Sequence, residues 1–304
     1  MAIEIARAKP AASTDSNADD PAFLKIRDLI YGTSGIYHSA EKLYLLISRC
    51  ARRMLALGAA SPAEYLEHLT PRGNRTAELR LLLNEITIGE TYMFRHPAQL
   101  DALRNVILPQ ILQLKNFVGL KRLRFWCAGC STGEEPHTLA MFLLEEKEKM
   151  LGGWTWDILA TDLNDNSLQT ARDGIYGEYA LRNTSAIMRR KYFKDVGDKK
   201  LQVNDLLKSQ VHFDRLNLSD DSKMVLQKGL DVIFCCNVLI YFDLASKRRV
   251  VQHFYSNLLP GGYLFLGHAE SLFQVDESFR LVHFPGTTAY WKPTAATAGE
   301  GKRK

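Results

Sequence analysis

The sequence contains no long hydrophobic run and no export signal. Its longest apolar stretches, 232–236 and 238–240, are interrupted by polar residues. They fall far short of the roughly 20 apolar residues that span a bilayer. Residues 1–20 begin with mixed charges and continue with Ala, Ser, Asn and Asp, without the compact apolar segment of a secretion signal. These absences predict a cytoplasmic protein that does not insert into a membrane, with disordered segments at 1–20 and 294–304.

The chain also has few cysteines and little net charge. An odd number of cysteines without an export signal favours reduced thiols over disulfides. A net charge of +5 is small for 304 residues, so it gives no reason to expect nucleic acid as a partner. The length and the 46% of hydrophobic residues suit one large globular domain or two modest ones. The five cysteines are Cys50, Cys127, Cys130, Cys235 and Cys236.

The first part of the chain has helical periodicity. From Phe23 to about Leu114, apolar residues recur at three- and four-residue spacing, which predicts a small all-α domain with a linker helix at 21–114. In one predicted helix, which should end at Gly58, we expect a buried face. This face consists of Leu43, Ile47, Cys50, Met54 and Leu57. The same helix carries a basic stripe of Lys42, Arg49, Arg52 and Arg53.

After Lys121, short apolar runs alternate with helical stretches. This alternation predicts an α/β domain at 115–293, with a mainly parallel sheet and helices on both faces. Ligands of such sheets bind beyond the carboxyl ends of the strands, near the point where the strand order reverses. A predicted hairpin at 280–291 adds antiparallel strands, and a small β-subdomain is inserted at about 190–208. The predicted strands are 123–127, 157–161, 211–213, 231–236 and 263–266.

A glycine-bearing turn follows the first predicted strand. The sequence from Cys127 to Pro136 places Gly129 and Gly133 where backbone approaches a ligand closely, and Pro136 suits the first turn of the next helix. A tight turn without a ligand is the alternative, because two glycines alone are weak support. The second predicted strand ends in Asp162, which is placed to accept hydrogen bonds from ribose hydroxyls.

The turn lacks the full G-x-G-x-x-G pattern of dinucleotide sites. Glu134 and Glu135 stand where a pyrophosphate would meet the start of the helix. A carboxylate there repels phosphate and attracts an ammonium or a sulfonium. S-adenosylmethionine carries both of these cations and no phosphate, so it is the predicted cofactor.

Five segments together resemble the CheR chemotaxis-receptor methyltransferases over about 23–291. They are ITIGETYMFR (86–95), FWCAGCSTGEEP (125–136), ATDL (160–163), NVLIYFD (237–243) and LPGGYLFLGHAE (259–270). The resemblance implies a class I methyltransferase-like (Rossmann-like) fold. It also implies transfer of a methyl group from S-adenosylmethionine to glutamate side chains of a chemoreceptor, which yields γ-methyl esters and S-adenosylhomocysteine.

The resemblance also assigns roles to residues. Arg95 and Tyr241 would be catalytic, and the basic stripe would bind the acidic helical bundle in the receptor's cytoplasmic region. The chain departs from the family at three positions: Gly89 stands where many members have Asn, Met93 where Phe is usual, and Cys236 where many have Arg. The implied cofactor-binding residues are Gly89, Thr91, Arg95, Gly129, Glu134, Glu135, Asp162, Asn217, Leu218, Cys236 and Asn237. We expect no metal and a monomer.

Each of these roles has a purely structural alternative. Arg95 would form an interdomain salt bridge, Tyr241 would pack under the next helix, and the basic stripe would be a solvated face. A second function is a cofactor-binding sensor without catalysis, which the departures at Gly89 and Cys236 motivate. A third is an amino-group methyltransferase on nucleic acid, although the N-P-P-Y type of signature is missing at 237–240. Four thiols converging beside the cofactor, with a redox or zinc role, is a separate hypothesis.

Overall fold

The computed structural model describes residues 20–70, 75–87 and 89–294 of the chain. Contacts divide it into two compact units. The helical unit extends to Ile86, and the second unit contains the residues from Thr87 onward together with Ser34–Ile36. The segments predicted to be disordered, 1–20 and 294–304, lie outside the described residues except for Asp20 and Thr294. None of the helices in the described ranges has the length and apolar character needed to cross a membrane.

The helical unit confirms the periodicity of the sequence. Helix α2 ends at Gly58, whose φ of 72° places it in the left-handed region. The Ser61 hydroxyl accepts a hydrogen bond from the Glu64 backbone N–H and caps α3. The predicted buried face of α2 is correct for its first half only, because Leu57 is 39% exposed. The elements are α1 (Pro21–Ser34), η2 (Ala40–Lys42), α2 (Leu43–Leu57), α3 (Pro62–His68) and α4 (Arg75–Ile86).

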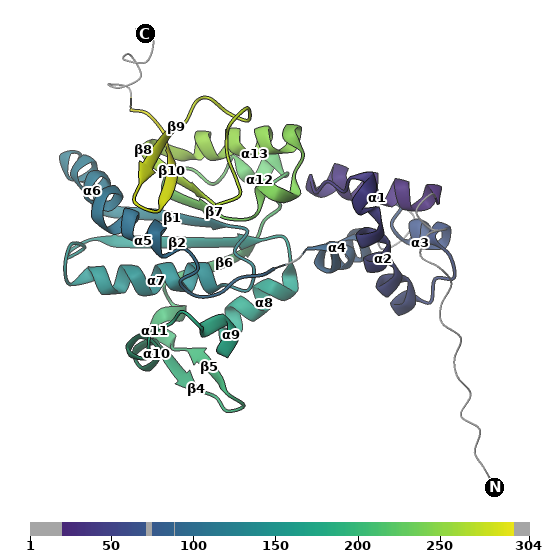
Figure 1. Ribbon diagram of the computed structural model, residues 1–304, viewed down its shortest axis with the longest axis horizontal. Coiled ribbons are helices and arrows are strands. Elements are labelled where there is room, and N and C mark those ends of the chain that lie inside the picture. The colour runs from purple at the N-terminus through teal and green to yellow at the C-terminus, as the bar shows by residue number, and fades with distance from the viewer. Residues whose placement is uncertain (1–19, 71–74, 88, 295–304) are drawn as a thin grey trace. The chain divides into compact units, whose positions relative to one another are not determined.

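The second unit is built on a seven-stranded sheet with the order β6-β2-β1-β7-β8-β10-β9 (Figure 1). The first five strands are parallel, and β10 and β9 form the predicted antiparallel hairpin. The sheet is therefore the methyltransferase-like one that the sequence predicts. Its strands are β1 (Arg122–Ala128), β2 (Thr155–Asp162), β6 (Val211–Arg215), β7 (Leu230–Cys235), β8 (Leu258–Leu266), β9 (Arg280–Phe284) and β10 (Thr287–Trp291).

Both faces of this sheet are covered by helices, so both faces of its central strands are buried. On β1, Phe125 and Cys127 pack in one core layer, while Trp126 and Ala128 pack in the other. This alternation follows from the two-residue period of a strand. The first layer includes side chains of α5 (Pro97–Ala102), η3 (Leu103–Ile107), α6 (Leu108–Phe117) and α7 (Glu134–Lys147), and the second those of α12 (Asp221–Met224) and α13 (Leu244–Asn257). Residues 97–114, which the sequence analysis grouped with the N-terminal helical domain and its linker helix, thus contribute to the core of the second unit.

A smaller three-stranded sheet of order β3-β5-β4 follows α8 (Asp165–Asp173). The hairpin between β4 and β5 turns at Gly197 and Asp198, as the sequence predicts, and both have positive φ. The third strand, β3, precedes the predicted range because it comes directly after α8. The insertion consists of β3 (Ile175–Gly177), α9 (Glu178–Leu181), α10 (Ala186–Tyr192), β4 (Phe193–Asp195), β5 (Lys200–Val203) and α11 (Asp205–Lys208).

Candidate active site

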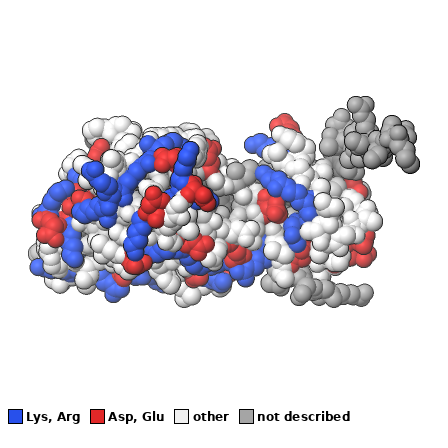
Figure 2. Space-filling view, turned by 90° about the horizontal axis from the view of Figure 1, so that it is seen from below, with Lys and Arg blue, Asp and Glu red and all other residues white. Residues whose placement is uncertain are grey.

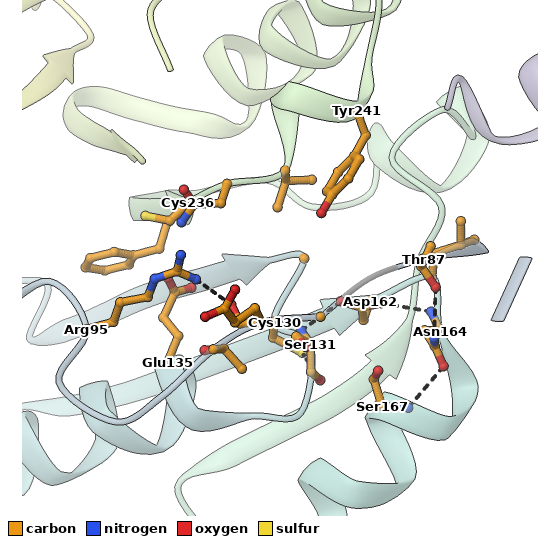
Figure 3. Close-up of a pocket in the computed structure, with 18 of the residues that line it drawn as sticks. Thr87, Arg95, Cys130, Ser131, Glu135, Asp162, Asn164, Ser167, Cys236 and Tyr241 are labelled. Atoms are coloured by element: carbon orange, nitrogen blue, oxygen red, sulfur yellow. Dashed lines mark hydrogen bonds between the residues drawn. The ribbon is translucent and has the colours of Figure 1, made fainter. Parts of the chain in front are cut away.

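A cavity of about 320 Å³ opens at the carboxyl ends of β6, β2, β1 and β7 (Figure 3). It lies where the strand order reverses, on either side of β1, which is the expected ligand position in a doubly wound sheet. Thr87 and residues of the segment 89–100 supply much of the remaining lining. Among the predicted site residues, those that line this cavity are Gly89, Thr91, Arg95, Gly129, Glu135, Asp162, Asn217, Leu218, Cys236, Asn237 and Tyr241.

The turn between β1 and α7 has the backbone that its glycines allow. The N–H groups of Gly129 and Cys130 both donate to the carbonyl oxygen of Thr161, at 2.8 and 2.9 Å. Gly133 has a φ of 92° at the N-cap of α7. A Cβ on Gly133 would lie 2.7 Å from the Cβ of Ala171 and 3.0 Å from its Cα. The glycine is thus required both by the dihedral angle and by close packing against α8.

We expect Gly133→Ala to lower the free energy of unfolding by about 3 kcal/mol, because strain and overpacking add. The matched control is Gly153→Ala. Gly153 has a φ of 77°, and a Cβ there would meet nothing within 4 Å, so the control isolates the dihedral cost of about 1 kcal/mol. Urea denaturation measures both variants. Equal losses would show that packing against α8 is not what requires the glycine.

Asp162, at the end of β2, is held by backbone donors. Its Oδ2 accepts from the Ser131 N–H at 2.7 Å, and its Oδ1 accepts from the Asn164 N–H at 2.8 Å. Burial nevertheless raises the pKa of its carboxyl group. Asn164 caps α8 with its Oδ1 and donates from Nδ2 to the Thr87 hydroxyl at 2.8 Å. Figure 3 shows this chain of contacts along one wall of the cavity.

The two glutamates at the start of α7 have different surroundings. Glu134 is 4% exposed and accepts from the Thr132 hydroxyl at 2.6 Å, and it is not among the described residues that line the cavity. Glu135 does line the cavity, and burial raises its pKa to about 7. Hydrogen bonds from the thiols of Cys127 and Cys236, with the positive charge of Arg95, oppose this rise in pKa. Glu135 is therefore the carboxylate placed to meet a cationic ligand.

The segment 89–95 is fixed to the rest of the second unit by its backbone. The Met93 N–H donates to the carbonyl of Ala180 at 2.8 Å, and the Phe94 N–H donates to the Thr138 hydroxyl at 3.1 Å. Met93, where the family usually has Phe, is fully buried. The Arg95 guanidinium donates to the carbonyl of Glu90 and lies over the cavity beside Glu135 (Figure 3). Arg95 is thus held at the cavity by local contacts.

The loop after β7 supplies the opposite wall. The Cys236 thiol donates to the side-chain Oε1 of Gln99 at 3.5 Å, and Asn237 has a φ of 61°. Asparagine tolerates this left-handed conformation better than most residues. Tyr241 points into the cavity from η4 (Leu239–Tyr241), and burial raises its pKa, which the charge of Arg95 opposes. Tyr241 therefore stays protonated and able to donate a hydrogen bond.

The cysteines do not form the four-thiol cluster that the sequence suggested. Cys127 packs in the first core layer and Cys235 in the second, on opposite faces of the sheet. The convergence hypothesis is wrong because Cys235, the last residue of β7, points to the face of the sheet opposite the one on which Cys127 and Cys130 pack. Burial raises the pKa of the thiols of Cys127, Cys130 and Cys236. No group of three or more metal-binding side chains occurs among the residues that the structure describes.

The basic stripe on α2 is partly engaged within the helical unit. Arg53 makes a bidentate pair with the buried Glu78, at 3.0 and 2.8 Å, and Arg52 lies 3.3 Å from Glu85. On the face of this unit shown in Figure 2, basic side chains lie beside acidic ones. Lys42 is exposed and Arg49 is half-buried. The stripe is therefore less uniformly cationic than its spacing in the sequence predicts.

Comparison with known proteins identifies the family. A family model described as the CheR methyltransferase SAM binding domain matches residues 89–287, and one described as its all-alpha domain matches residues 21–87. The chain is 34% identical to chemotaxis protein methyltransferase 2 of Vibrio cholerae, over 92% of this chain and 96% of that protein. It is 36% identical to the chemotaxis protein methyltransferase of Borreliella burgdorferi, over 80% and 86% of the two chains.

The chain belongs to the CheR methyltransferase family. This CheR protein is an S-adenosylmethionine-dependent methyltransferase of chemotaxis, as the sequence predicts.

The cavity of this CheR protein suits that cofactor. The Ser131 hydroxyl and the Asn237 side-chain amide nitrogen are buried without a hydrogen-bond partner among the described residues, and both residues line the cavity. Buried polar atoms of this kind require partners, which a polar ligand supplies. A Cβ on Gly89 would lie 2.1 Å from the Ser131 hydroxyl, so glycine leaves that hydroxyl room. When bound, S-adenosylmethionine supplies an electrophilic methyl group on its sulfonium.

Four further residues shape the CheR site without having been singled out from the sequence. They are Gln99, which receives the Cys236 thiol; Thr138, which holds the 89–95 segment; Asn164, which links Asp162 to Thr87; and Glu270, which binds the loop after β7. Glu270 is the last residue of 259–270, one of the five segments that resemble the family. For Gln99 and Thr138, which lie in helices, the available signal was a polar residue among apolar ones, and for Asn164 it was a helix-capping residue type.

Proposed function

We propose that this enzyme transfers a methyl group from S-adenosylmethionine to glutamate side chains in the cytoplasmic helical bundle of a chemoreceptor. The products are glutamyl γ-methyl esters and S-adenosylhomocysteine. The observation that carries the proposal is the arrangement of one cavity: Glu135 faces it as the partner of a cation, and Arg95 and Tyr241 face it as partners of an anion. This arrangement fits a cationic cofactor beside an acidic side chain.

The chain's own residues mainly bind and orient. A glutamate carboxylate has an ordinary pKa of about 4.3 and is anionic at neutral pH, so it needs no general base. Arg95 presents a guanidinium fork to the carboxylate, and the protonated Tyr241 donates from its hydroxyl. Holding the reactants in line accounts for about 7–11 kcal/mol of a barrier in well-oriented reactions. Positioning is therefore the main contribution that these residues make.

The cofactor-binding roles follow the lining of the cavity. Asp162 would accept from ribose hydroxyls, Asn217, Leu218 and Asn237 would border the adenosine, and Glu135 would meet the charged amino-acid portion. Gly89 and Gly129 would permit close approach, and Thr91 would lie beside the cofactor. Glu134 would act indirectly through the start of α7, because its carboxylate bonds to Thr132. Cys236 would contribute through its backbone and through its thiol contact with Glu135.

The receptor would approach a cationic surface. Lys42 and Arg49 remain the best candidates of the basic stripe for steering an acidic bundle, since Arg53 is committed to Glu78 and Arg52 to Glu85. We expect the enzyme to act in the cytoplasm and as a monomer, which light scattering at micromolar concentration checks.

Transfer of radiolabelled methyl groups to purified cytoplasmic domains of receptors from the same organism tests the proposal. Base-labile label that is lost in Arg95→Ala would support glutamate esters. Label that resists base would indicate an amine or another acceptor. If wild-type enzyme binds S-adenosylhomocysteine in a calorimeter but labels no receptor domain, the proposal fails and a sensor takes its place.

A further inference from the structure

Glu270 lies in the loop that follows β8, and its carboxylate accepts three backbone hydrogen bonds. Its Oε2 accepts from the N–H of Asn237 at 2.6 Å and of Gly267 at 2.7 Å. Its Oε1 accepts from the N–H of Ile240 at 3.2 Å. Hydrogen bonds to a charged acceptor are stronger than neutral ones, so one side chain ties the loop after β7 to the loop after β8.

The two loops pack closely at this point. A Cβ on Gly267 would lie 2.7 Å from the Asn237 side-chain oxygen, 2.9 Å from the Asn237 backbone nitrogen and 2.9 Å from Oε2 of Glu270. Asn237 is in the left-handed conformation, which leaves its N–H outside the ladder of β7. Ile240 belongs to the short helix η4, whose first N–H groups have no partner within the helix. Glu270 therefore satisfies donors that the chain geometry leaves open.

We propose that Glu270 is a positioning residue for methyl transfer. Its carboxylate binds the backbone N–H groups of Asn237 and Ile240, and this fixes the positions of Asn237 and Tyr241 relative to each other. Asn237 and Tyr241 both line the cavity, and the Tyr241 backbone follows directly from Ile240. Glu270 itself is not among the described residues that line the cavity, so it acts through these two. The inference rests on the proposed roles of Asn237 at the cofactor and of Tyr241 at the substrate.

The two oxygens of Glu270 bind different donors, so different substitutions of this residue should break different contacts. In Glu270→Gln, the single carbonyl oxygen keeps more bonds when it faces the two donors of Asn237 and Gly267. The NH₂ group then faces the Ile240 N–H, and two donors oppose each other. The disturbance falls on η4 and Tyr241 and spares Asn237. Glu270→Ala removes the acceptor for all three donors and disturbs both sides of the cavity.

The test compares Glu270→Gln with Glu277→Gln, an exposed glutamate of the same loop. Turnover is expressed per site that binds S-adenosylhomocysteine, which corrects for unfolded protein. For Glu270→Gln we expect kcat to fall about 10- to 100-fold while the Kd for S-adenosylhomocysteine changes less than about threefold, since the Ile240 N–H loses its charged acceptor and faces another donor, while Asn237 keeps its bond. Glu270→Ala should also raise that Kd by about tenfold or more. Glu277→Gln should change neither.

Hydrogen–deuterium exchange of the peptide spanning 237–243 tests the same inference without activity. Exchange at Ile240 should accelerate in Glu270→Gln and not in Glu277→Gln. If wild-type enzyme proves inactive on receptors, the proposed function fails, and this measurement still decides the role of Glu270. Unchanged exchange, or a kcat within twofold of wild type, would overturn the inference. A parallel loss of kcat, affinity and melting temperature would also overturn it and leave a purely structural role. Should Glu270→Gln not fold, Glu270→Asp serves, with the same readouts and the same criteria.

Discussion

Arg95→Ala is expected to lower kcat/KM for receptor methylation by about 10²–10³-fold, the usual cost of removing one well-placed charged or polar donor. The Arg95 guanidinium lies at the cavity, where it would orient the acidic substrate. It also lowers the pKa of Glu135 and of Tyr241 through its charge. Alanine removes both effects, so the loss should appear in kcat as well as in KM. Steady-state methylation of receptor domains measures it.

Two variants control for charge and for fold. Arg95→Lys retains a cation without the planar fork, and its activity should lie between those of wild type and Arg95→Ala. Arg190→Ala removes an exposed arginine of α10 and should leave kcat/KM unchanged. Arg95→Ala activity within threefold of wild type would rule out the substrate-orienting role. Equal losses in Arg95→Ala and Arg190→Ala would point to general electrostatic attraction of the acidic receptor.

Glu135→Gln is expected to weaken cofactor binding by about 10- to 100-fold, since a charge-assisted contact contributes about 1.5–3 kcal/mol. Burial raises the pKa of Glu135 to about 7 in the free enzyme. Below that pH the carboxyl is protonated and must lose a proton to meet a cation. Affinity for S-adenosylhomocysteine should therefore rise with pH up to about 7 and level off above it. The variant should lack this pH dependence between pH 6 and 8.

Calorimetry in two buffers of different ionisation enthalpy measures how many protons are released when the ligand binds. At pH 6 the wild-type enzyme should release close to one proton on binding S-adenosylhomocysteine, and Glu135→Gln none. His96, which also lines the cavity, does not interfere, because burial and Arg95 lower its pKa to about 4. Glu148→Gln, at the exposed end of α7, should behave as wild type. Identical proton release in wild type and Glu135→Gln would assign the proton to another group.

The charge of Glu135 has opposite effects on cofactor affinity and on the stability of the free enzyme. The pKa of Glu135 is higher in the folded state than its ordinary value of 4.5, so the protonated form favours folding. This contribution is present below pH 4.5 and is lost as the pH rises through about 7. Glu135→Gln should therefore melt at a higher temperature than wild type at pH 8, while binding its cofactor less tightly. A lower melting temperature at pH 8 would contradict this assignment of the buried charge.

The departure at Cys236 explains part of this pKa. Where many relatives place Arg, this chain places beside Glu135 a thiol, which lowers the pKa of Glu135 but brings no charge. Arg95 is then the cation that acts on Glu135, and burial outweighs it. The sequence showed the substitution, but only the structure showed that Cys236, just after β7, lies beside Glu135, in the first turn of α7.

The fold followed from local patterns. The parallel strands β1, β2 and β7 appeared as short apolar runs, and the hairpin of β9 and β10 appeared as strand-like segments around Pro285 and Gly286. The buried face of α2 was predicted too long, because periodicity records which residues share a face and not where a neighbouring helix ends. The insertion was predicted too short, because three residues of β3 give too weak a period to recognise.

The sequence by itself determined the family, the cofactor and the segments that carry the site, since motif spacing along strands and turns is a local property. Only the tertiary structure decided which side chains reach the cavity. Glu135 faces it and Glu134 faces Thr132, although the two are neighbours, because successive residues of a helix point about 100° apart. Cys235 packs in the second core layer, away from Cys127 in the first, because the side chains of a strand alternate between the two faces of a sheet. The contacts of Glu270 with the loop after β7 join residues far apart in the chain, so local spacing does not predict them.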